Sequence, residues 1–473
     1  MTLPIFSRAA GRIGAALLLL VLGTAGASAQ QAQKETPPAP GAPKDFSIPS
    51  PTKFTLDNGM KVTLVPYGTI PKVTVDLAVL GGDASEGADQ VWLGELMSSW
   101  MTEGTTTRTA SQISQATARM GGSLDVTVGP NSTRVTGDSL SDFGPEMVRL
   151  VADVAEHPSF PESELARLKA DQVRQLSIAK SRPQQIALEK FRSVMYPNHA
   201  YGRIFPTPEM IQGFTAAQVR AYYEASVGAA RAHLYVAGRF DPAPMESAVR
   251  EAFGGWKAGT PVSFPPPPAS PRSARAIHLI DRPGAPQSTI ILGVPVIDPS
   301  NPEYVPLLVT NTLLGGYFSS RITSNIREAK GYTYSPFSQV SVRYRDGYWA
   351  QNADVTTNAT GPSLKEIFYE IDRLKKEPPS ADELKAVQNY MAGVFVLQNS
   401  SRAGIIGQLE FVDLHGLPDD YLSGYVRRVY AVTPADVRRM TQKYIQDEKA
   451  TIVVVGDKKV IEEQLKPYGT ISR

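Results

Sequence analysis

The chain has 473 residues, with 48 basic and 46 acidic side chains, five His, 38 Gly, 38 Pro and no Cys. This length exceeds what one hydrophobic core usually organises, so we expect at least two domains, and 42% apolar with 20% charged residues is typical of a globular protein. The lack of Cys excludes disulfide frameworks, thiol catalysis, Cys-ligated zinc and iron–sulfur clusters.

Residues 1–29 have the pattern of a secretory signal peptide. Arg8 and Arg12 precede an apolar run over residues 13–22, and small residues end the segment at Ala29. The alternative is an uncleaved anchor, but the run is short for a span of about 20 apolar residues. Cleavage removes two Arg and no acid, so the formal charge of +2 falls to zero. We therefore expect a neutral periplasmic or secreted protein with no membrane span after cleavage, and nothing favours nucleic-acid binding.

Composition divides the remaining chain. Residues 30–47, rich in Gln, Ala, Pro, Lys and Gly, predict a disordered leader. A Pro-rich run within residues 261–272 predicts a semi-rigid linker. The linker separates two domains of similar size, over residues 48–260 and 273–473.

Each predicted domain opens with strand signals. Asn58-Gly59 lies between two β-prone runs, which is the pattern of a hairpin. The second domain opens with strand-like residues 276–281 and 287–294. Helical periodicity follows in both domains.

Residues 92–101 predict an amphipathic helix. Six apolar side chains with a 3.6-residue period define the side that we expect to be buried: Trp92, Leu93, Leu96, Met97, Trp100 and Met101. Glu95, Ser98 and Ser99 share the other face, and Glu95 is interpreted as an exposed carboxylate rather than a catalytic group. The segment ends at Glu103-Gly104-Thr105.

A glycine-entered strand is predicted after the next helix, over residues 120–128. Gly121 and Gly122 precede an alternating pattern that includes Leu124 and Val126, and glycines allow a second backbone to approach closely. The pattern fits an ordinary turn and strand as well as a strand that binds a ligand.

A second notable helix is predicted in the C-terminal domain. Ser319 or Ser320 suits its start and Gly331 its end. Arg327 then lies in the last helical turn, and Tyr334 begins a β-like segment seven residues later. By spacing alone, an Arg that meets the helix dipole and a Tyr in ordinary packing explain both residues.

The two domains resemble each other. Four residues recur 218 positions later, Thr215, Ala217, Val219 and Arg220 matching Thr433, Ala435, Val437 and Arg438. The apolar run at 234–238 recurs at 452–456 with the same offset, and both runs end at Gly. We therefore predict a duplicated α+β protein, with two homologous domains that each hold a mixed or antiparallel sheet and helices mainly on one face.

Several motifs together resemble the pitrilysin/insulinase zinc peptidases, which include the mitochondrial processing peptidases and bacterial two-domain relatives. The resemblance covers essentially the whole mature chain in order. Its motifs are Leu56-Asp57-Asn58-Gly59, Gly81-Gly82, the 92–105 segment, Tyr196-Pro197-x-His199-x-Tyr201-Gly202, Asp281-Arg282-Pro283-Gly284-Ala285-Pro286-Gln287, Leu314-Gly315-Gly316-Tyr317-Phe318-Ser319-Ser320-Arg321 and Arg327-Glu328-x-Lys330-Gly331-x-x-Tyr334.

The resemblance aligns the family's zinc motif with a segment of this chain that lacks the zinc ligands. Active relatives carry His-x-x-Glu-His, whose two His bind one zinc from one helical face while the Glu takes a proton from the metal-bound water. The matching positions hold Glu95, Ser98 and Ser99, and the third ligand falls near Gln175 or Leu176. We therefore expect no metal and no cofactor in this chain.

The five His offer no obvious substitute. They are at least 34 residues apart, so no local pair exists: His157, His199, His233, His278 and His415. His199 is interpreted as a structural residue of a turn, and the others as surface or packed side chains.

The resemblance also implies roles for the remaining residues. Arg327 and Tyr334 would bind the substrate and stabilise negative charge on the carbonyl oxygen during hydrolysis. The strand with Gly121, Gly122, Leu124 and Val126 would lie at a sheet edge and take the peptide as an added strand.

These implications predict an exported non-zinc subunit of a heterodimeric metalloendopeptidase. It would be inactive alone and would supply Arg327 and Tyr334 to a homologous zinc-bearing partner that acts on unfolded peptide. The alternatives are a peptide-binding or scaffold protein that acts without any hydrolase, and an independent peptidase with another site, which the spacing of the His disfavours.

Overall fold

The computed structural model describes residues 49–264, 267 and 274–472. The predicted signal peptide, the predicted leader up to residue 47 and most of the Pro-rich run lie outside these residues. The described residues belong to one compact unit. None of their helices is both long enough and apolar enough to cross a membrane.

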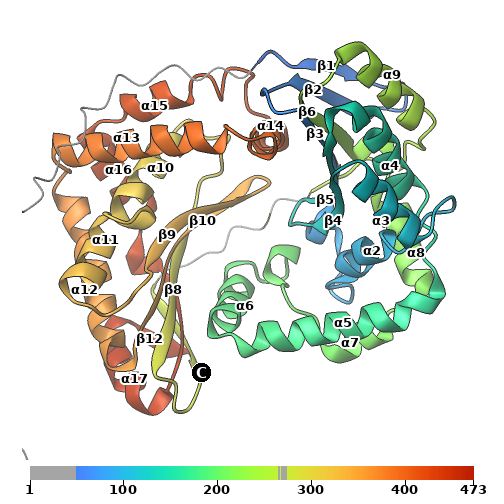
Figure 1. Ribbon diagram of the computed structural model, residues 1–473. Helices are drawn as coiled ribbons and strands as arrows, with labels where there is room; N and C mark the ends of the chain where they lie inside the picture. Colours follow the sequence, from blue (N-terminus) through green and yellow to red (C-terminus); the bar gives the residue numbers. More distant parts are fainter. Residues whose placement is uncertain (1–48, 265–266, 268–273, 473) are drawn as a thin grey trace, which may run out of the picture. The chain divides into compact units, whose positions relative to one another are not determined.

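Two six-stranded sheets organise the chain (Figure 1). The first has the order β1-β2-β6-β3-β5-β4 and the second the order β12-β7-β11-β8-β10-β9. Both are mixed, because β2 pairs parallel with β6, β7 pairs parallel with β11 and β12, and the other pairs are antiparallel. The strands are β1 (Thr52–Thr55), β2 (Lys61–Pro66), β3 (Lys72–Leu80), β4 (Ser123–Val128), β5 (Ser132–Leu140), β6 (Ala232–Gly238), β7 (Ala276–Asp281), β8 (Gln287–Val296), β9 (Phe337–Arg343), β10 (Asp346–Thr356), β11 (Thr451–Gly456) and β12 (Thr470–Ser472).

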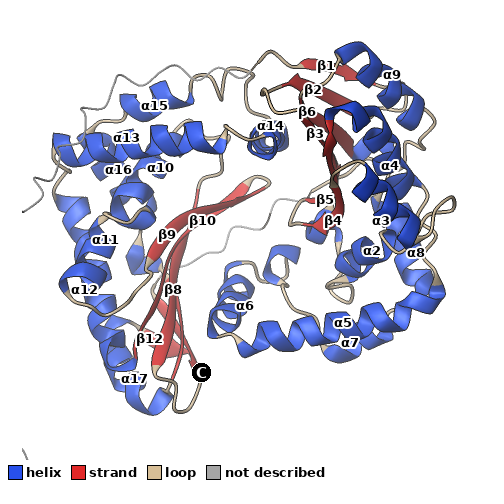
Figure 2. Cartoon of the chain, in the orientation of Figure 1, coloured by secondary structure: helices blue, strands red, loops and turns tan. Residues whose placement is uncertain are grey.

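Helices pack mainly on one face of each sheet, as predicted, with α4 against β3 and β5 and α12 against β10 (Figure 2). The helical segments of the first half are η1 (Gly82–Ser85), α2 (Leu93–Met101), α3 (Ala110–Arg119), η2 (Ser141–Phe143), α4 (Gly144–Glu156), α5 (Glu162–Ser181), α6 (Pro183–Met195), η3 (Ala200–Gly202), α7 (Pro208–Gly213), α8 (Ala216–Ser226), η4 (Ala229–Arg231) and α9 (Pro242–Phe253). Those of the second half are α10 (Tyr304–Asn311), η5 (Thr312–Gly316), α11 (Arg321–Thr323), η6 (Ser324–Ala329), η7 (Thr357–Ala359), α12 (Thr360–Lys376), α13 (Ala381–Gln398), α14 (Arg402–His415), α15 (Tyr425–Ala431), α16 (Pro434–Tyr444), η8 (Asp447–Lys449), α17 (Lys458–Leu465) and η9 (Lys466–Tyr468). Among the η segments, η5 and η6 are π-helical and the others are 3-10 helical.

The duplication predicted from the sequence is confirmed by the strand order, which is the same in both sheets from β2 to β4 and from β7 to β9. The recurring Thr has a local cause. Thr215 starts α8 and Thr433 starts α16, and each closes a capping box with the residue three positions later. A capping box satisfies two backbone N–H groups that a helix start otherwise leaves free.

The second face of each sheet is covered by a helix from the opposite half. Four apolar residues of α14 pack on the first sheet, in one cluster with Val65, Ala78, Tyr235 and Ala237: Ile405, Ile406, Leu409 and Val412. Residues of α6 pack on the second sheet in the same way, in a cluster that includes the fully buried Phe191. Burial on both faces explains why strand residues 452–455 form an uninterrupted apolar run.

Polar contacts reinforce this exchange. The Tyr235 hydroxyl donates to the Asp413 carboxylate on α14 at 2.7 Å. Arg402, the first residue of α14, donates to Asp138 on β5 at 2.9 Å. On the other side, the Tyr196 hydroxyl after α6 donates to Asp346 on β10.

Two local predictions have different outcomes. The Asn-Gly hairpin is confirmed, since β1 and β2 pair antiparallel around Gly59, which has a φ of 89°. The prediction that Tyr334 begins a strand is wrong, because β9 starts only at Phe337. The backbone at Thr333 forms a single bridge to Val355, so the chain crosses the end of β10 before it joins the ladder.

Candidate functional site

A carboxylate from the loop before α2 caps the helix that carries the degenerate zinc motif. Trp92 precedes α2 in a left-handed conformation with φ of 70°, and its side chain offers no cap. The Glu86 carboxylate instead accepts the N–H of Trp92 at 3.1 Å and of Gly94 at 2.8 Å. The first turn of α2 is therefore tied to the loop after η1.

The three residues of the degenerate motif have different environments. Ser99 is exposed, but Ser98 is only 4% exposed and donates its hydroxyl to the carbonyl oxygen of Glu95 at 3.0 Å. Glu95 has a fully buried Oε2 atom. The interpretation of Glu95 as an exposed carboxylate is therefore wrong, because η1 and the loop after it cover this side of α2, which the helical period alone does not reveal.

Glu95 belongs to a cluster of three carboxylates, of which Glu86 is buried and the other two are partly buried. One oxygen from each of Asp83, Glu86 and Glu95 lies within 4.8 Å of the others. Burial, followed by repulsion from Glu95, raises the pKa of Glu86 to about 9. Burial and Asp83 raise the pKa of Glu95 to about 8. Burial also raises the pKa of Asp83 to about 6, although Arg192 and Arg343 oppose this shift.

The cluster does not fit a catalytic zinc site. Its donors are all carboxylate oxygens, both oxygens of Glu86 already accept backbone N–H groups, and Ser98 provides no base for a bound water. Oxygen-only donors suit hard cations such as Ca²⁺ or Mg²⁺ better. With pKa values of about 9 and about 8, Glu86 and Glu95 hold protons at neutral pH.

The helix expected to carry a third ligand contributes an amide instead. Gln172 on α5 donates its Nε2 to the Trp92 carbonyl at 3.0 Å and is buried. Gln175 is exposed and Leu176 is buried, so neither residue that the spacing indicated offers a ligand to α2. Asp83, Glu86 and Gln172 were missed because no motif marks them.

Replacing Glu95 by Gln is expected to stabilise the protein at alkaline pH. The pKa of Glu95 is about 8 in the folded protein and near 4.5 in the unfolded chain. The contribution of its protonated form to the free energy of unfolding is therefore complete below pH 4.5 and is lost as the pH rises through about 8. Glu95→Gln should therefore raise the free energy of unfolding at pH 8.5 by about 1–2 kcal/mol and change little at pH 4.5.

Chemical denaturation at both pH values, in EDTA and again with Mg²⁺ or Ca²⁺, measures this effect. Glu224→Gln, an exposed substitution on α8, is the control. If Glu95→Gln destabilised the protein at pH 8.5 only when a cation is present, the cluster would bind that cation. This result would contradict the account in which protonated carboxyl groups stabilise the cluster.

The structure brings Arg327 and Tyr334 together. The Arg327 guanidinium on η6 lies 5.1 Å from the centre of the Tyr334 ring, which is 80% exposed. A third residue, Phe318, lies on the same guanidinium at 4.3 Å and is 65% exposed. Arg327 also forms an ion pair with Glu328 at 3.2 Å. Phe318 belongs to one of the family-like motifs, but no pattern in the sequence predicts that it contacts Arg327.

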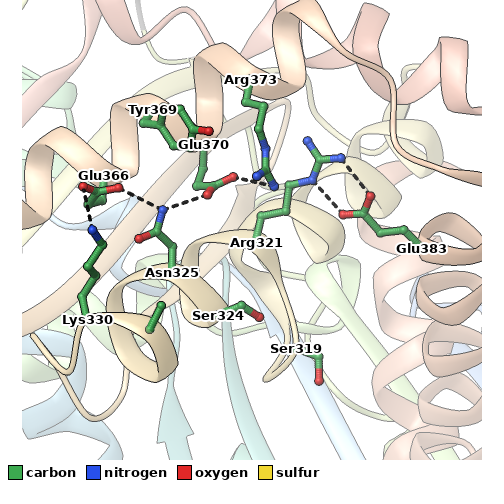
Figure 3. Close-up of a pocket in the computed structure, with 11 residues that line it drawn as sticks. Ser319, Arg321, Ser324, Asn325, Lys330, Glu366, Tyr369, Glu370, Arg373 and Glu383 are labelled. Atoms are coloured by element: carbon green, nitrogen blue, oxygen red, sulfur yellow. Dashed lines mark hydrogen bonds and ion pairs between the residues drawn. The ribbon is translucent and has the colours of Figure 1, made fainter.

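Polar contacts from α12 hold the helix that carries Arg327 (Figure 3). Asn325 on η6 donates to Glu366 at 3.1 Å and to Glu370 at 2.8 Å. Lys330 forms an ion pair with Glu366 at 3.7 Å. One turn earlier, Arg321 donates two parallel bonds to Glu383 at 2.7 and 2.8 Å. These side chains line a pocket of about 640 Å³ and fix the backbone from which Arg327 projects.

The helix before Tyr334 ends as predicted. Gly331, with φ of 65°, accommodates the left-handed turn after η6. Ser320 precedes α11, but its hydroxyl donates to the Thr323 hydroxyl instead of capping the helix.

The candidate peptide-binding strand β4 is the last strand of the first sheet. Leu124 and Val126 are partly buried against the first core, while the alternate side chains of β4 are exposed. Gly121 has φ of 66°, and a Cβ atom on Gly122 would lie 1.6 Å from the carbonyl oxygen of Asp138 on β5. The two glycines are therefore required by the turn and by the neighbouring strand.

His199 has the structural surroundings expected of it. Its Nδ1 atom accepts the N–H of Tyr201 at 3.2 Å, and its ring contacts that of Tyr201. No group of three or more potential metal ligands in the described part of the chain includes a His.

Two family profiles match the chain. Residues 62–209 match the family described as Insulinase (Peptidase family M16), and residues 213–391 match the family described as Peptidase M16 inactive domain. Among curated proteins, an uncharacterised zinc protease of Bacillus subtilis is 23% identical over 351 residues, which is 74% of this chain and 84% of that protein. An uncharacterised zinc protease of Streptomyces coelicolor is 22% identical over 87% of this chain and 91% of its own length.

Solved structures show the same fold. The peptidase M16 inactive domain from Pseudomonas fluorescens has a TM-score of 0.79 at 23% identity and covers 86% of this chain and 98% of its own. A protease from Helicobacter pylori has a TM-score of 0.81 at 18% identity and covers 87% of this chain and all of its own.

Proposed function

This chain belongs to peptidase family M16, the insulinase family, and on that premise we propose that it is the non-zinc subunit of a two-chain metalloendopeptidase. A homologous partner with an intact His-x-x-Glu-His motif would supply zinc and the activated water. This chain would supply Arg327 and Tyr334, and the substrate would be an unfolded peptide.

One observation carries the proposal. Arg327 and Tyr334 lie together at the surface, in a chain whose zinc-motif positions are Glu95, Ser98 and Ser99. A guanidinium and a phenol side by side can donate hydrogen bonds to one oxygen atom as negative charge develops on it. The chemistry needs a metal-bound water from elsewhere, which is why a partner is required.

Extended peptide has a natural binding position on the first half. β4 ends its sheet, so its outer backbone groups can pair with an added strand. Gly121 and Gly122 would shape the turn that begins this edge, while Leu124 and Val126 anchor it to the core. Backbone pairing gives affinity with little dependence on sequence.

We further propose that the protein acts in the periplasm or outside the cell, directed there by residues 1–29. Unfolded peptides in that compartment would be the substrate pool.

Reconstitution tests the proposal. This chain and an M16 homologue with His-x-x-Glu-His, encoded by the same genome, are purified separately and mixed in the presence of a fluorogenic unfolded peptide. We expect no cleavage by this chain alone, cleavage by the mixture, and zinc in the partner only. Stoichiometric zinc in the purified single chain, with cleavage that a chelator abolishes, would contradict the proposal.

The second candidate function is peptide binding without hydrolysis. It is favoured by the positions of β4 and β9, which end their sheets in the described part of the chain and can bind an extended chain without any catalytic group. Tight peptide binding by this chain, with no cleavage when any His-x-x-Glu-His homologue of the organism is added, would support this function over the first.

A further inference from the structure

A pocket of about 410 Å³ lies between α10, η5, α13, α14 and the start of α15. None of the described residues that line it is charged, and Gln398 and Gln408 supply amide groups. Six of the lining side chains are aromatic: Tyr304, Tyr390, Phe395, Phe411, Tyr421 and Tyr425. A pocket of this size, with aromatic walls and a few polar groups, is typical of a binding site.

A glycine inside α14 gives access to the helix backbone in this pocket. Gly407 lines the pocket, and a Cβ atom there would have nothing within 4 Å beyond its own helix. Glycine inside a helix costs about 1 kcal/mol relative to Ala. Gly316 on the same wall has a packing reason, since its Cβ atom would lie 2.7 Å from the Asn311 amide, but Gly407 has none. We infer that another group approaches the α14 backbone at Gly407.

The chain enters the first sheet beside this pocket. β1 is antiparallel to β2 with Thr52 opposite Leu64, so the residues before Thr52 lead toward the end of β2 and the following Tyr67. The Tyr67 hydroxyl donates to the carbonyl oxygen of Asn399 at 2.8 Å, and Asn399 follows the lining residue Gln398.

A second contact leads to the same place. Lys53 on β1 forms an ion pair with Asp419 at 2.9 Å. Asp419 precedes the lining residue Tyr421 by two positions, a span of at most about 7 Å. Residues just before β1 can therefore reach the pocket.

The segment before residue 49 has a repeating apolar pattern. Pro37, Pro40, Pro43 and Phe46 recur at every third position. A polyproline II helix has three residues per turn, so it aligns these four side chains along one side. Residues 36–43 carry no charge, which matches the uncharged lining of the pocket.

The chemistry of the pocket suits such a segment. Grooves lined by aromatic rings bind polyproline II segments, because the apolar Pro rings pack on the aromatic faces and little conformational entropy is lost. The backbone carbonyls of this conformation have no internal hydrogen bonds, and Tyr hydroxyls and the amides of Gln398 and Gln408 can donate to them.

We propose that residues 37–46 bind this pocket of the same chain as a polyproline II segment, with Pro and Phe side chains between the aromatic rings and one of them against Gly407. This contact would join the start of the first half to the helices of the second half. It goes beyond the proposed function and does not depend on it.

The experiment measures binding of a labelled peptide of residues 35–48 by fluorescence anisotropy. It compares the mature chain, residues 30–473, with a shorter chain that begins at residue 49. The shorter chain should bind the peptide. The mature chain should bind it about 10-fold more weakly, because its own segment competes at an effective concentration on the order of 1 mM. Replacing Pro37, Pro40 and Pro43 of the peptide by Ala should weaken binding to the shorter chain by about 10-fold.

Gly407→Leu in the shorter chain places a side chain in the pocket and should weaken peptide binding by at least about 10-fold. Gly393→Leu is the matched control. Gly393 is an exposed residue of α13 that does not line the pocket, and a Cβ atom there also has nothing within 4 Å. Leu is a good helix former, so both variants should fold, which thermal unfolding checks.

No binding of the peptide by the shorter chain, equal affinity of the two chains, or unchanged affinity in Gly407→Leu would each overturn the proposal. A dimer formed by the mature chain and not by the shorter chain would assign the segment to the pocket of a second copy, which would overturn binding within one chain. None of these results bears on the two-chain peptidase, whose test is cleavage by the mixture.

Discussion

Arg327→Ala is expected to lower kcat/KM of the reconstituted complex by about 10²–10³-fold, because it removes a charged donor from the oxygen that becomes negative during hydrolysis. Substrate affinity should fall less, since the interaction strengthens as charge develops. Tyr334→Phe removes one hydroxyl and should cost about 10- to 100-fold. Initial rates against substrate concentration separate kcat from KM in each case.

Two control variants accompany this test. Arg174→Ala removes an exposed Arg of α5, whose side chain is 67% exposed, and Tyr369→Phe removes a hydroxyl outside the proposed site. Both should retain wild-type rates. Unchanged cleavage in Arg327→Ala and Tyr334→Phe alike would show that the assigned catalytic role is wrong, even if the complex forms and cleaves.

Phe191→Ala is expected to lower the free energy of unfolding by about 3–5 kcal/mol. Phe191 is fully buried on α6 and reaches across to the second sheet, where its ring lies edge-on to Tyr348 with 5.3 Å between the centres. A Cβ atom on Gly293 of β8 would lie 2.6 Å from the Phe191 ring, so the ring fits against the strand because this residue has no side chain. Truncation leaves a cavity where the halves meet, which the rigid sheet cannot close.

Urea denaturation followed by tryptophan fluorescence measures this loss. Phe337→Ala, which removes a ring that is half exposed, should change the free energy of unfolding by less than about 1 kcal/mol. The transition of Phe191→Ala should stay single if the exchanged helices make the halves cooperative. A loss below about 1 kcal/mol, or two separate transitions in the wild-type chain, would contradict this account.

Much of the fold follows from the sequence because local chemistry repeats. The capping Thr at 215 and 433, the Asn58-Gly59 turn and the apolar runs before Gly238 and Gly456 each specify an element without reference to distant residues. The pairing of Arg327 with Tyr334 was implied by the family resemblance and not by spacing, and the structure places the two side chains together.

Other features depend on contacts that no local pattern encodes. The helical period of residues 92–101 separates Glu95 from the apolar stripe but does not reveal that a second segment with Asp83 and Glu86 covers that side. Likewise, an amphipathic pattern predicts that α6 buries one face but does not say which sheet receives it. Phe318 differs in the opposite direction from Glu95: a Phe is expected to be buried, but this side chain is exposed.

The exchange of α6 and α14 bears on how such a chain could arise. α14 begins at Arg402, 219 residues after α6 begins at Pro183, so the two helices are the same element of the repeated unit. A single unit folded alone would leave one face of its sheet exposed to solvent. In the two-unit chain, each sheet has this face covered by the corresponding helix of the other unit. The geometry is that of a domain-swapped symmetric dimer whose subunits have been joined end to end. In the joined chain, one half could lose its catalytic residues and still be retained, because its helix covers the sheet of the other half.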